Sequence, residues 1–253
     1  MLWCVYMNLL KTKSFEVAAY VAGREDALRV ALVLPGRLDT KDYVHMRSHA
    51  DFLASLGYLA VSFDPPGTWE SPGDPSLFTT TNYVKVVGEI IEHYGNRPTL
   101  LVGHSRGGAT AMLSSMKYPK VTGIVLVNAN YQSPSDPSPE AAERGYNIDY
   151  RDLLPGDRET EEKFEFRLPL AYWEDGKNHD PAAALRACTK SKLIIHGTED
   201  EFSPLDDVKT LFEELPDPKT LCVIDSAHDY RYRPEAIDTV NREMRSFLKE
   251  NDL

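Results

Sequence analysis

Residues 100–108 read LLVGHSRGG, an apolar run that leads directly into a Gly-x-Ser-x-Gly motif. A strand over 99–102 followed by a helix from about 106 to 117 places Ser105 on the tight turn between them. Such a turn strains the serine backbone and projects Oγ from the sheet edge, and the flanking glycines keep side chains out of a crowded space. The stretch predicts a nucleophilic serine; the alternative is a glycine-rich turn with an incidental serine.

The rest of the chain alternates short apolar runs with helical patterns. The apolar runs predict further strands at Arg29–Leu34, Tyr58–Phe63, Val121–Val127, Lys192–His196 and Thr220–Ile224. The helical patterns cover Ser48–Leu56, Thr80–Tyr94, Pro204–Leu215 and Pro234–Lys249. Strands of this kind, separated by helices, indicate an α/β fold in which helices cover both faces of a mostly parallel sheet.

The segment 130–190 breaks that rhythm. It opens with the proline-rich run SPSDPSPE and continues with many charges and seven aromatic residues, without a clear strand. We expect a small helical lid here, inserted into a core formed by 1–129 and 191–253. The alternative is an ordinary helical excursion that packs on itself.

Composition limits the class of protein. A chain of 253 residues with 42% hydrophobic residues can form one large domain without a disulfide or a metal. The net charge of −11 argues against nucleic acid and anionic lipid as partners. The three cysteines, read as small core residues, favour a reducing, cytoplasmic compartment: Cys4, Cys188 and Cys222.

The N-terminal run MLWCVYMNLL is apolar, and the first lysine, Lys11, follows it. The run lacks a charged start and is about half as long as a membrane span requires. We interpret it as an extra strand, a disordered start or a start-site artefact, with a secretory signal as a less favoured reading. No later segment is expected to span a membrane.

The strand, Gly-x-Ser-x-Gly turn and helix resemble the α/β-hydrolase superfamily, and the resemblance extends from about Phe15 to the C-terminal helix. It implies an α/β-hydrolase fold, with a mostly parallel central sheet and a small lid. In this family the nucleophile is followed along the chain by an acid and then by a histidine.

The expected acid follows the run KLIIH, in the turn Gly-Thr-Glu-Asp-Glu-Phe-Ser-Pro. This resembles the family's late acidic turn and implies Asp200 as the acid that orients the histidine. Glu199 and Glu201 are neighbouring competitors. The alternative is an acidic cluster that merely begins a helix.

The expected histidine is His228, in the loop after the run TLCVID, where the family places its general base. The alternative is a solvated loop histidine. His104 precedes the nucleophile and is expected to point away from it, and His196 is expected to be buried in a structural role. Two further histidines could line the site, because they lie near the expected oxyanion loop: His45 and His49.

An oxyanion hole needs two N–H donors. The resemblance implies Arg106 N–H, directly after the nucleophile, and a second donor from the loop Pro-Gly-Arg-Leu at 35–38. We assign the second donor to Arg37, with Leu38 as the rival, although the family's usual histidine before the glycine is absent. The alternative is a plain Pro-Gly turn. The later loop DPPGTWES at 64–71 also departs from the family turn, and its Trp69 could reach the pocket wall.

Together these residues predict a serine hydrolase that cleaves a carboxylic ester or related acyl bond of a small molecule through an acyl-enzyme. No metal or organic cofactor is expected, and the molecule is expected to be a monomer or homodimer. A peptidase or a C–C bond hydrolase could use the same triad. A ligand-sensing binding protein on a hydrolase scaffold is the alternative from another class.

Overall fold

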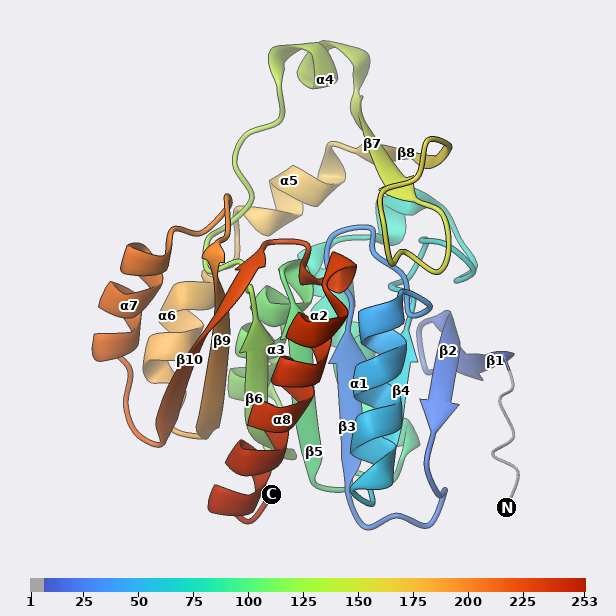
Figure 1. Ribbon diagram of the computed structural model, residues 1–253. Helices are drawn as coiled ribbons and strands as arrows, with labels where there is room; N and C mark the ends of the chain where they lie inside the picture. Colours follow the sequence, from blue (N-terminus) through green and yellow to red (C-terminus); the bar gives the residue numbers. More distant parts are fainter. Residues whose placement is uncertain (1–6) are drawn as a thin grey trace.

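The computed structural model describes residues 7–253, and the residues before Met7, Cys4 among them, lie outside the described part. An eight-stranded sheet has the order β1-β2-β4-β3-β5-β6-β9-β10 (Figure 1). The strands span Met7–Lys11 (β1), Glu16–Ala22 (β2), Val30–Leu34 (β3), Leu59–Phe63 (β4), Thr99–His104 (β5), Val121–Val127 (β6), Ser191–Glu199 (β9) and Lys219–Ala227 (β10). The strands from β4 to β10 in this order pair in parallel, whereas β1 and β2 are antiparallel to their neighbours.

Helices cover both faces of this sheet because its central strands are apolar on both sides. In β3, Leu32 belongs to one hydrophobic cluster and its neighbours Ala31 and Val33 to the other, as the alternation of a strand requires. One face carries α1 (Val44–Ser55) and α8 (Pro234–Glu250). The opposite face carries α2 (Thr80–His93), α3 (Arg106–Lys117), α6 (Pro181–Ala187) and α7 (Leu205–Glu213).

The predicted α/β-hydrolase fold with its mostly parallel sheet is confirmed. Each of the core strands and helices expected from the sequence is present, and α3 has the predicted bounds. Helix α1 begins at Val44, four residues before the expected start. Of the readings for the apolar N-terminus, the extra strand is confirmed for Met7–Lys11, and the residues before it are not described. Strand β2 was not predicted from the sequence.

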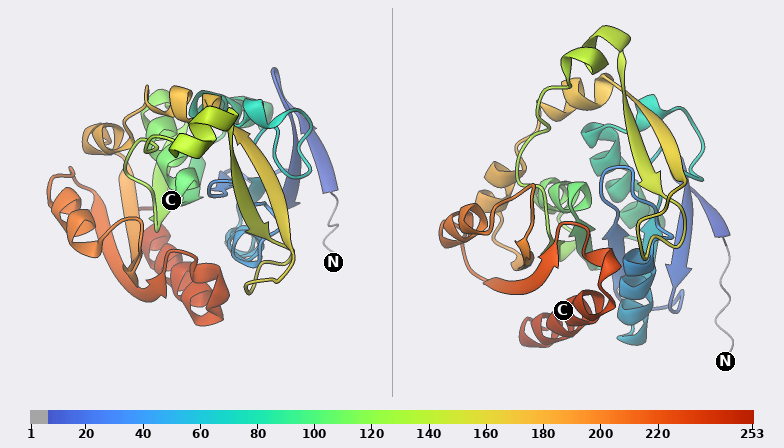
Figure 2. Two further views of the ribbon diagram at one scale, coloured as in Figure 1. Left: turned by 90° about the horizontal axis from the view of Figure 1, so that it is seen from above. Right: turned by 45° about the horizontal axis from the view of Figure 1, so that its top comes forward.

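The segment 130–190 differs from the expected helical lid. It contains α4 (Pro139–Arg144), α5 (Ala171–Gly176) and an unpredicted antiparallel hairpin of β7 (Tyr146–Asp152) and β8 (Lys163–Pro169). Figures 1 and 2 show α4, α5 and the hairpin above the carboxyl ends of the parallel strands. Helix α6, which was assigned to the lid, packs against α3 in the core.

The predicted small helical lid is corrected to a mixed segment, because β8 has the alternation of a strand. Phe164, Phe166 and Leu168 alternate with charged residues, which is the pattern of a half-buried strand. The hairpin lies on the core through the stacked contact of Phe164 with Trp69, whose ring centroids are 5.1 Å apart. Within the described part of the chain, no helix is both long and apolar enough to cross a membrane.

Candidate active site

Ser105 occupies the turn between β5 and α3 and has the strained backbone that the motif predicts. Its φ is 50° and its ψ is −116°, in a region that non-glycine residues rarely adopt. Glycine is required beside it, since a Cβ on Gly107 would lie 2.0 Å from the carbonyl oxygen of Leu34. The turn is held further by Ser105 N–H, which donates to the carbonyl of Val127 at 3.2 Å.

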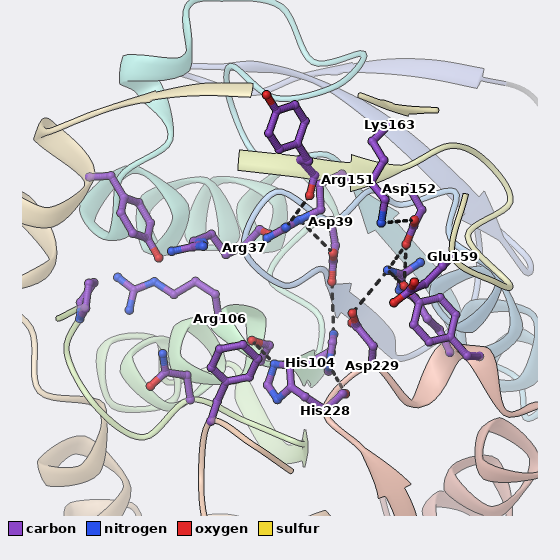
Figure 3. Close-up of a pocket in the computed structure, with 18 of the residues that line it drawn as sticks. Arg37, Asp39, His104, Arg106, Arg151, Asp152, Glu159, Lys163, His228 and Asp229 are labelled. Atoms are coloured by element: carbon purple, nitrogen blue, oxygen red, sulfur yellow. Dashed lines mark hydrogen bonds and ion pairs between the residues drawn. The ribbon is translucent and has the colours of Figure 1, made fainter. Parts of the chain in front are cut away.

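His228 and Asp200 meet the serine at this edge of the sheet. His228 Nε2 lies 2.8 Å from Ser105 Oγ, and its Nδ1 lies 2.9 Å from Asp200 Oδ2 (Figure 3 shows His228 at the cavity floor). Asp200 Oδ1 accepts the backbone N–H groups of Phe202 and Ser203 at 2.9 and 3.0 Å. The three predicted catalytic side chains are therefore in one hydrogen-bonded chain, in the arrangement of a nucleophile, a base and an orienting acid.

The electrostatics of this chain suit proton transfer. Burial by itself lowers the pKa of His228, but the hydrogen bond and charge of Asp200, with the charges of Asp229 and Glu201, outweigh it and raise the pKa above the usual value. Burial raises the pKa of Asp200, and the contacts with His228 and two backbone N–H groups reverse this and lower it. Asp200 is therefore favoured in its charged form, and a carboxylate at this position would stabilise a protonated His228.

The two competing acids have other partners. Glu199 forms an ion pair with Arg233 at 3.2 Å, and Glu201 accepts the backbone N–H of His228 at 3.2 Å. Only Asp200 reaches the imidazole of His228 among these three acids.

The predicted oxyanion loop lies beside the nucleophile. A Cβ on Gly36 would lie 3.3 Å from Ser105 Cβ, so the chain passes Ser105 closely. The loop is held by the Trp69 indole, which donates to the carbonyl of Leu38 at 2.8 Å, and by Arg151, which donates to the carbonyl of Arg37 at 2.6 Å. The assignment of Arg37 and Arg106 N–H as donors stays a prediction, supported by this proximity and by the position of Arg106 at the start of α3.

A cavity of about 380 Å³ opens above Ser105. Its wall is rich in ionisable groups from both the core and the segment above it, as Figure 3 shows. The charged members are Arg37, Asp39, Arg106, Arg151, Asp152, Glu159, Lys163, Asp229 and Arg231. Trp69, which was expected to reach the pocket wall, instead packs against the hairpin and is absent from this lining.

A buried cluster that sequence reasoning missed joins the cavity wall to the hairpin. Arg231 donates to Asp152 Oδ2 at 2.7 Å and to the carbonyl of Gly156 at 2.9 Å, and Tyr232 donates to the same carboxylate at 2.5 Å. Asp229 also pairs with Arg231, at 3.4 Å. The sequence shows only isolated charges here, because Asp152 and Arg231 are far apart along the chain.

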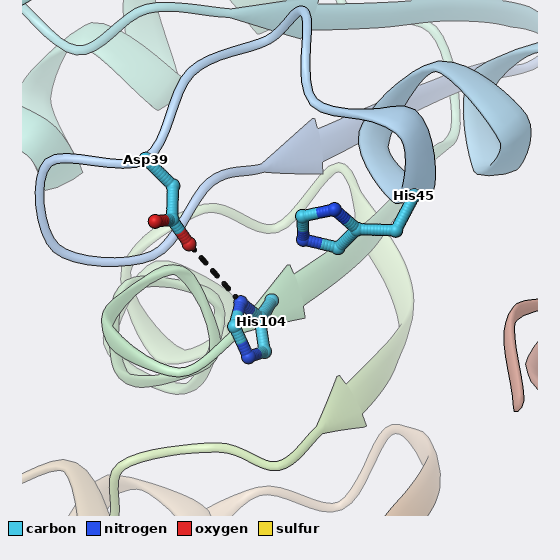
Figure 4. A group of neighbouring side chains, drawn as sticks. All are labelled: Asp39, His45 and His104. Carbon is cyan, nitrogen blue, oxygen red and sulfur yellow. Dashed lines mark hydrogen bonds and ion pairs between the residues drawn. The ribbon is translucent and has the colours of Figure 1, made fainter. Parts of the chain in front are cut away.

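A second missed group surrounds His104, which was expected to point away from the nucleophile. Its ring instead lines the cavity, with Nδ1 3.3 Å from Asp39 Oδ2 and Nε2 3.1 Å from the carbonyl oxygen of His228 (Figure 4 shows Asp39 and His104 with His45). Burial favours the protonated carboxyl of Asp39, but His104 and the charges of Arg151 and Arg231 hold its pKa well below the usual range.

Asp39, His45 and His104 each offer one ligand atom, and these atoms lie within 4.8 Å of one another. Nε2 of His104 lies 3.1 Å from the His228 carbonyl oxygen, so the group supports the His228 backbone. Nδ1 of His104 contacts Asp39 within the group, and the expected absence of a metal stays a prediction.

The prediction that His45 and His49 could line the site was wrong, because both are fully buried behind it. His49 contacts Asn241 and the hydroxyl of Tyr230. Burial lowers the pKa of His49 to about 4, so it is neutral at pH 7. His196 is buried against the carbonyl of Ser203 at 2.7 Å, as the structural role requires.

The parallel sheet, the strained serine and the histidine–carboxylate pair at its carboxyl edge define the class of α/β proteins with a nucleophile elbow. The model of the family described as "alpha/beta hydrolase fold" matches residues 32–168, and the chain belongs to this family. A second model, described as "PhoPQ-activated pathogenicity-related protein", matches residues 172–253. The chain is therefore a hydrolase of the α/β-hydrolase superfamily.

Several curated and solved proteins are similar to it. "Palmitoyl-protein thioesterase ABHD10, mitochondrial" from Mus musculus is 23% identical over 81% of this chain and 70% of its own length. Its counterpart from Rattus norvegicus is 21% identical over 91% of this chain and 78% of its own length.

Among solved structures, a putative hydrolase from Agrobacterium vitis has a TM-score of 0.75 and 23% identity, over 98% of this chain and 99% of its own. Est1E from Butyrivibrio proteoclasticus with bound ferulic acid has a TM-score of 0.72 and 17% identity, over 97% of this chain and 100% of its own. At these identities the structures bear on the fold alone.

Proposed function

We propose that the protein hydrolyses an ester or thioester of a small molecule through an acyl-enzyme formed on Ser105. The observation that carries the proposal is the continuous chain from Ser105 Oγ to His228 and on to Asp200, at 2.8 and 2.9 Å. The curated relatives named as thioesterases support hydrolysis of an acyl bond, and the carboxylic ester is the specific form we favour.

In the first half-reaction, His228 accepts the hydroxyl proton while Ser105 Oγ attacks the carbonyl carbon. The negative charge moves to the carbonyl oxygen, where the N–H groups of Arg106 and Arg37 are proposed to stabilise it. When the tetrahedral intermediate collapses, His228 donates its proton to the leaving alcohol or thiol. The products of this step are the acyl-enzyme and the free leaving group.

In the second half-reaction, a water molecule loses a proton to His228 and attacks the acyl carbon. Collapse releases the carboxylic acid and returns the proton to Ser105. Asp200 keeps its negative charge throughout and orients the imidazole. Apart from the substrate and the water molecule, each group in this proposed mechanism belongs to the chain. A cytoplasmic location and a monomeric or homodimeric state stay predictions from the sequence.

A fluorophosphonate probe tests the proposal, because it reacts with serines activated by this kind of base. The wild-type protein is expected to be labelled and Ser105→Ala to remain unlabelled. Ser114→Ala is the matched control, since this serine is buried farther along α3 and its hydroxyl has no hydrogen-bond partner within residues 7–253. An unlabelled wild-type protein would contradict the enzyme proposal and favour a ligand-sensing scaffold.

Bond type is tested with 4-nitrophenyl esters and acyl thioesters of graded chain length, set beside peptide and C–C bond substrates. We expect ester or thioester turnover that Ser105→Ala abolishes. Probe labelling combined with cleavage of only a peptide or C–C substrate would replace the proposed function with that alternative.

A further inference from the structure

Arg106 places a buried cation beside the nucleophile. The residue is 2% exposed, and its Nη2 donates to Thr80 Oγ1. Its guanidinium carbon lies 5.3 Å from the ring centroid of Tyr172, and Nη1 is buried without a hydrogen-bond partner within residues 7–253. None of the ion pairs formed by the described residues includes Arg106. A buried guanidinium with an unused donor and no counter-charge is costly.

Three of the four acids that line the cavity already contact basic side chains, and the fourth, Glu159, forms no ion pair with Arg106. Asp152 pairs with Arg231 at 2.7 Å, and Asp39 lies 3.7 Å from Arg151 and 3.3 Å from the ring of His104. A further acid, on the hairpin, pairs with Arg37: Asp149, at 2.7 Å. Arg106 is therefore a cation whose charge is left for a ligand.

The guanidinium lies on the side of the cavity formed by the segment above the sheet. A Cβ on Gly176 of α5 would lie 3.5 Å from Arg106 Nη2 and 2.6 Å from Pro134. Arg106 and Pro134 line the same cavity as Ser105. Figure 3 shows the side chain extending along the wall, away from His228. Because Arg106 and Ser105 line one cavity, an anion bound there by the guanidinium would lie in the same cavity as the reacting carbonyl.

We propose that the substrate carries a carboxylate, which binds Arg106 while Ser105 attacks an ester or thioester carbonyl of the same molecule. This inference rests on the proposed function and names its substrate class. A single carboxylate can accept the unused N–H groups of Nη1 and balance the buried charge. The segment 140–180, with its excess of acidic residues, disfavours phosphate-rich acyl donors, so a compact monocarboxylate fits better.

Matched substrates test the inference. One pair is the 4-nitrophenyl monoester of glutaric acid and the same compound methylated at its free carboxyl. A second pair places the carboxylate in the leaving group: the butyrate ester of 4-hydroxybenzoic acid and of its methyl ester. In each pair, kcat/KM for the charged member is divided by kcat/KM for the neutral member. The pair with the higher ratio shows which side of the scissile bond carries the carboxylate.

For at least one pair, we expect Arg106→Gln to lower this ratio about tenfold to a hundredfold, the worth of a charge-assisted hydrogen bond. Arg106→Lys keeps the charge without the planar fork and is expected to lower the ratio less. Lys209→Gln removes an exposed cation on α7 and is the control for net charge; its ratio is expected to equal that of the wild-type protein.

If Arg106→Gln lowers kcat/KM equally for the charged and the neutral members of both pairs, the inference is overturned. Arg106 would then be only a structural contact of α5. Competition in the wild-type protein gives a result even if Arg106→Gln does not fold. Glutarate is expected to slow fluorophosphonate labelling, and glutaramide, which has no charge, is not. Equal effects of the two would also count against carboxylate binding. If the wild-type protein is labelled and hydrolyses neutral esters but does not prefer the charged substrates, this inference alone is refuted. If it is neither labelled nor active on any ester, the proposed function is refuted.

Discussion

Ser105 and His228 of the proposed triad border the same cavity as the cluster around Arg231, but the two groups connect different parts of the molecule. Ser105, Asp200 and His228 follow three strands of the core, and their mutual contacts are made within the core. Arg231, by contrast, follows His228 in the chain and reaches out to Asp152 of the hairpin. The core holds the chemical groups in place, while ion pairs across the cavity hold the segment that covers them.

This difference separates the expected effects of mutation. A change in the proposed triad is expected to alter the reaction and to leave most packing intact. A change at Arg231 removes the nearest cation from the buried carboxylate of Asp152 and is expected to weaken the attachment of the hairpin. Asp229 interacts with both groups, because it pairs with Arg231 and its charge also raises the pKa of His228.

The largest effect is expected from Asp200→Asn. The amide cannot hold the imidazole of His228 in the required tautomer or stabilise its charged form, so kcat for ester hydrolysis should fall about 10⁴-fold. Steady-state kinetics measure this fall, and circular dichroism checks that the fold persists. Glu199→Gln is the matched control, because this acid pairs with Arg233 instead. A near-normal rate in Asp200→Asn would remove Asp200 from the triad.

A loss of stability is expected from Arg231→Met. It leaves the buried carboxylate of Asp152 with Lys163, at 3.1 Å, as its remaining cation, and losing one partner of a buried ion pair costs up to about 3–5 kcal/mol of unfolding free energy. Urea denaturation measures the change. The double variant Arg231→Met/Asp152→Asn should recover part of the loss, because the uncompensated charge is gone. If the double variant is less stable than Arg231→Met, the ion pair does not account for the effect.

The smallest effect is expected from Asp229→Asn. His228 must be neutral to act as a base, so activity falls as pH decreases through its pKa, which lies above the usual 6.5. Loss of the Asp229 charge lowers that pKa and moves the acidic limb of kcat/KM to lower pH. The shift should be roughly 0.2–0.7 unit, since exposed charge pairs contribute about 0.2–1 kcal/mol. If the acidic limb of the kcat/KM profile moves to higher pH in Asp229→Asn, the charge of Asp229 does not raise the pKa of His228.

The nucleophile turn was predictable because its determinants are local. The strand over 99–102, the glycines around Ser105 and the helix to Lys117 are adjacent in the sequence, and steric demands leave few alternatives. Asp200 and His228 were placed by chain order, since each follows a strand of a parallel sheet whose carboxyl ends meet at one edge.

The wall of the cavity was not predictable in the same way. The contact between Asp39 and His104 joins residues 65 positions apart, and no spacing rule links them. The hairpin left a local signal in Phe164, Phe166 and Leu168, but the proline-rich start of the segment and its many charges outweighed it. Long-range ion pairs depend on the tertiary structure, which a single sequence does not reveal.

The loop beside Ser105 has its carbonyls held from outside, by Arg151 of the hairpin at Arg37 and by Trp69 at Leu38. The hydrogen bond from Arg151 to the Arg37 carbonyl therefore couples the hairpin to the loop, because displacing the hairpin would break it. Suppose that a ligand binds more tightly when the hairpin lies against the loop. By thermodynamic linkage, binding of this ligand then also favours the ordered loop, and an ordered loop strengthens ligand binding by the same free energy. Substrate binding and ordering of the predicted oxyanion loop would then depend on the same equilibrium, the position of the hairpin relative to the loop.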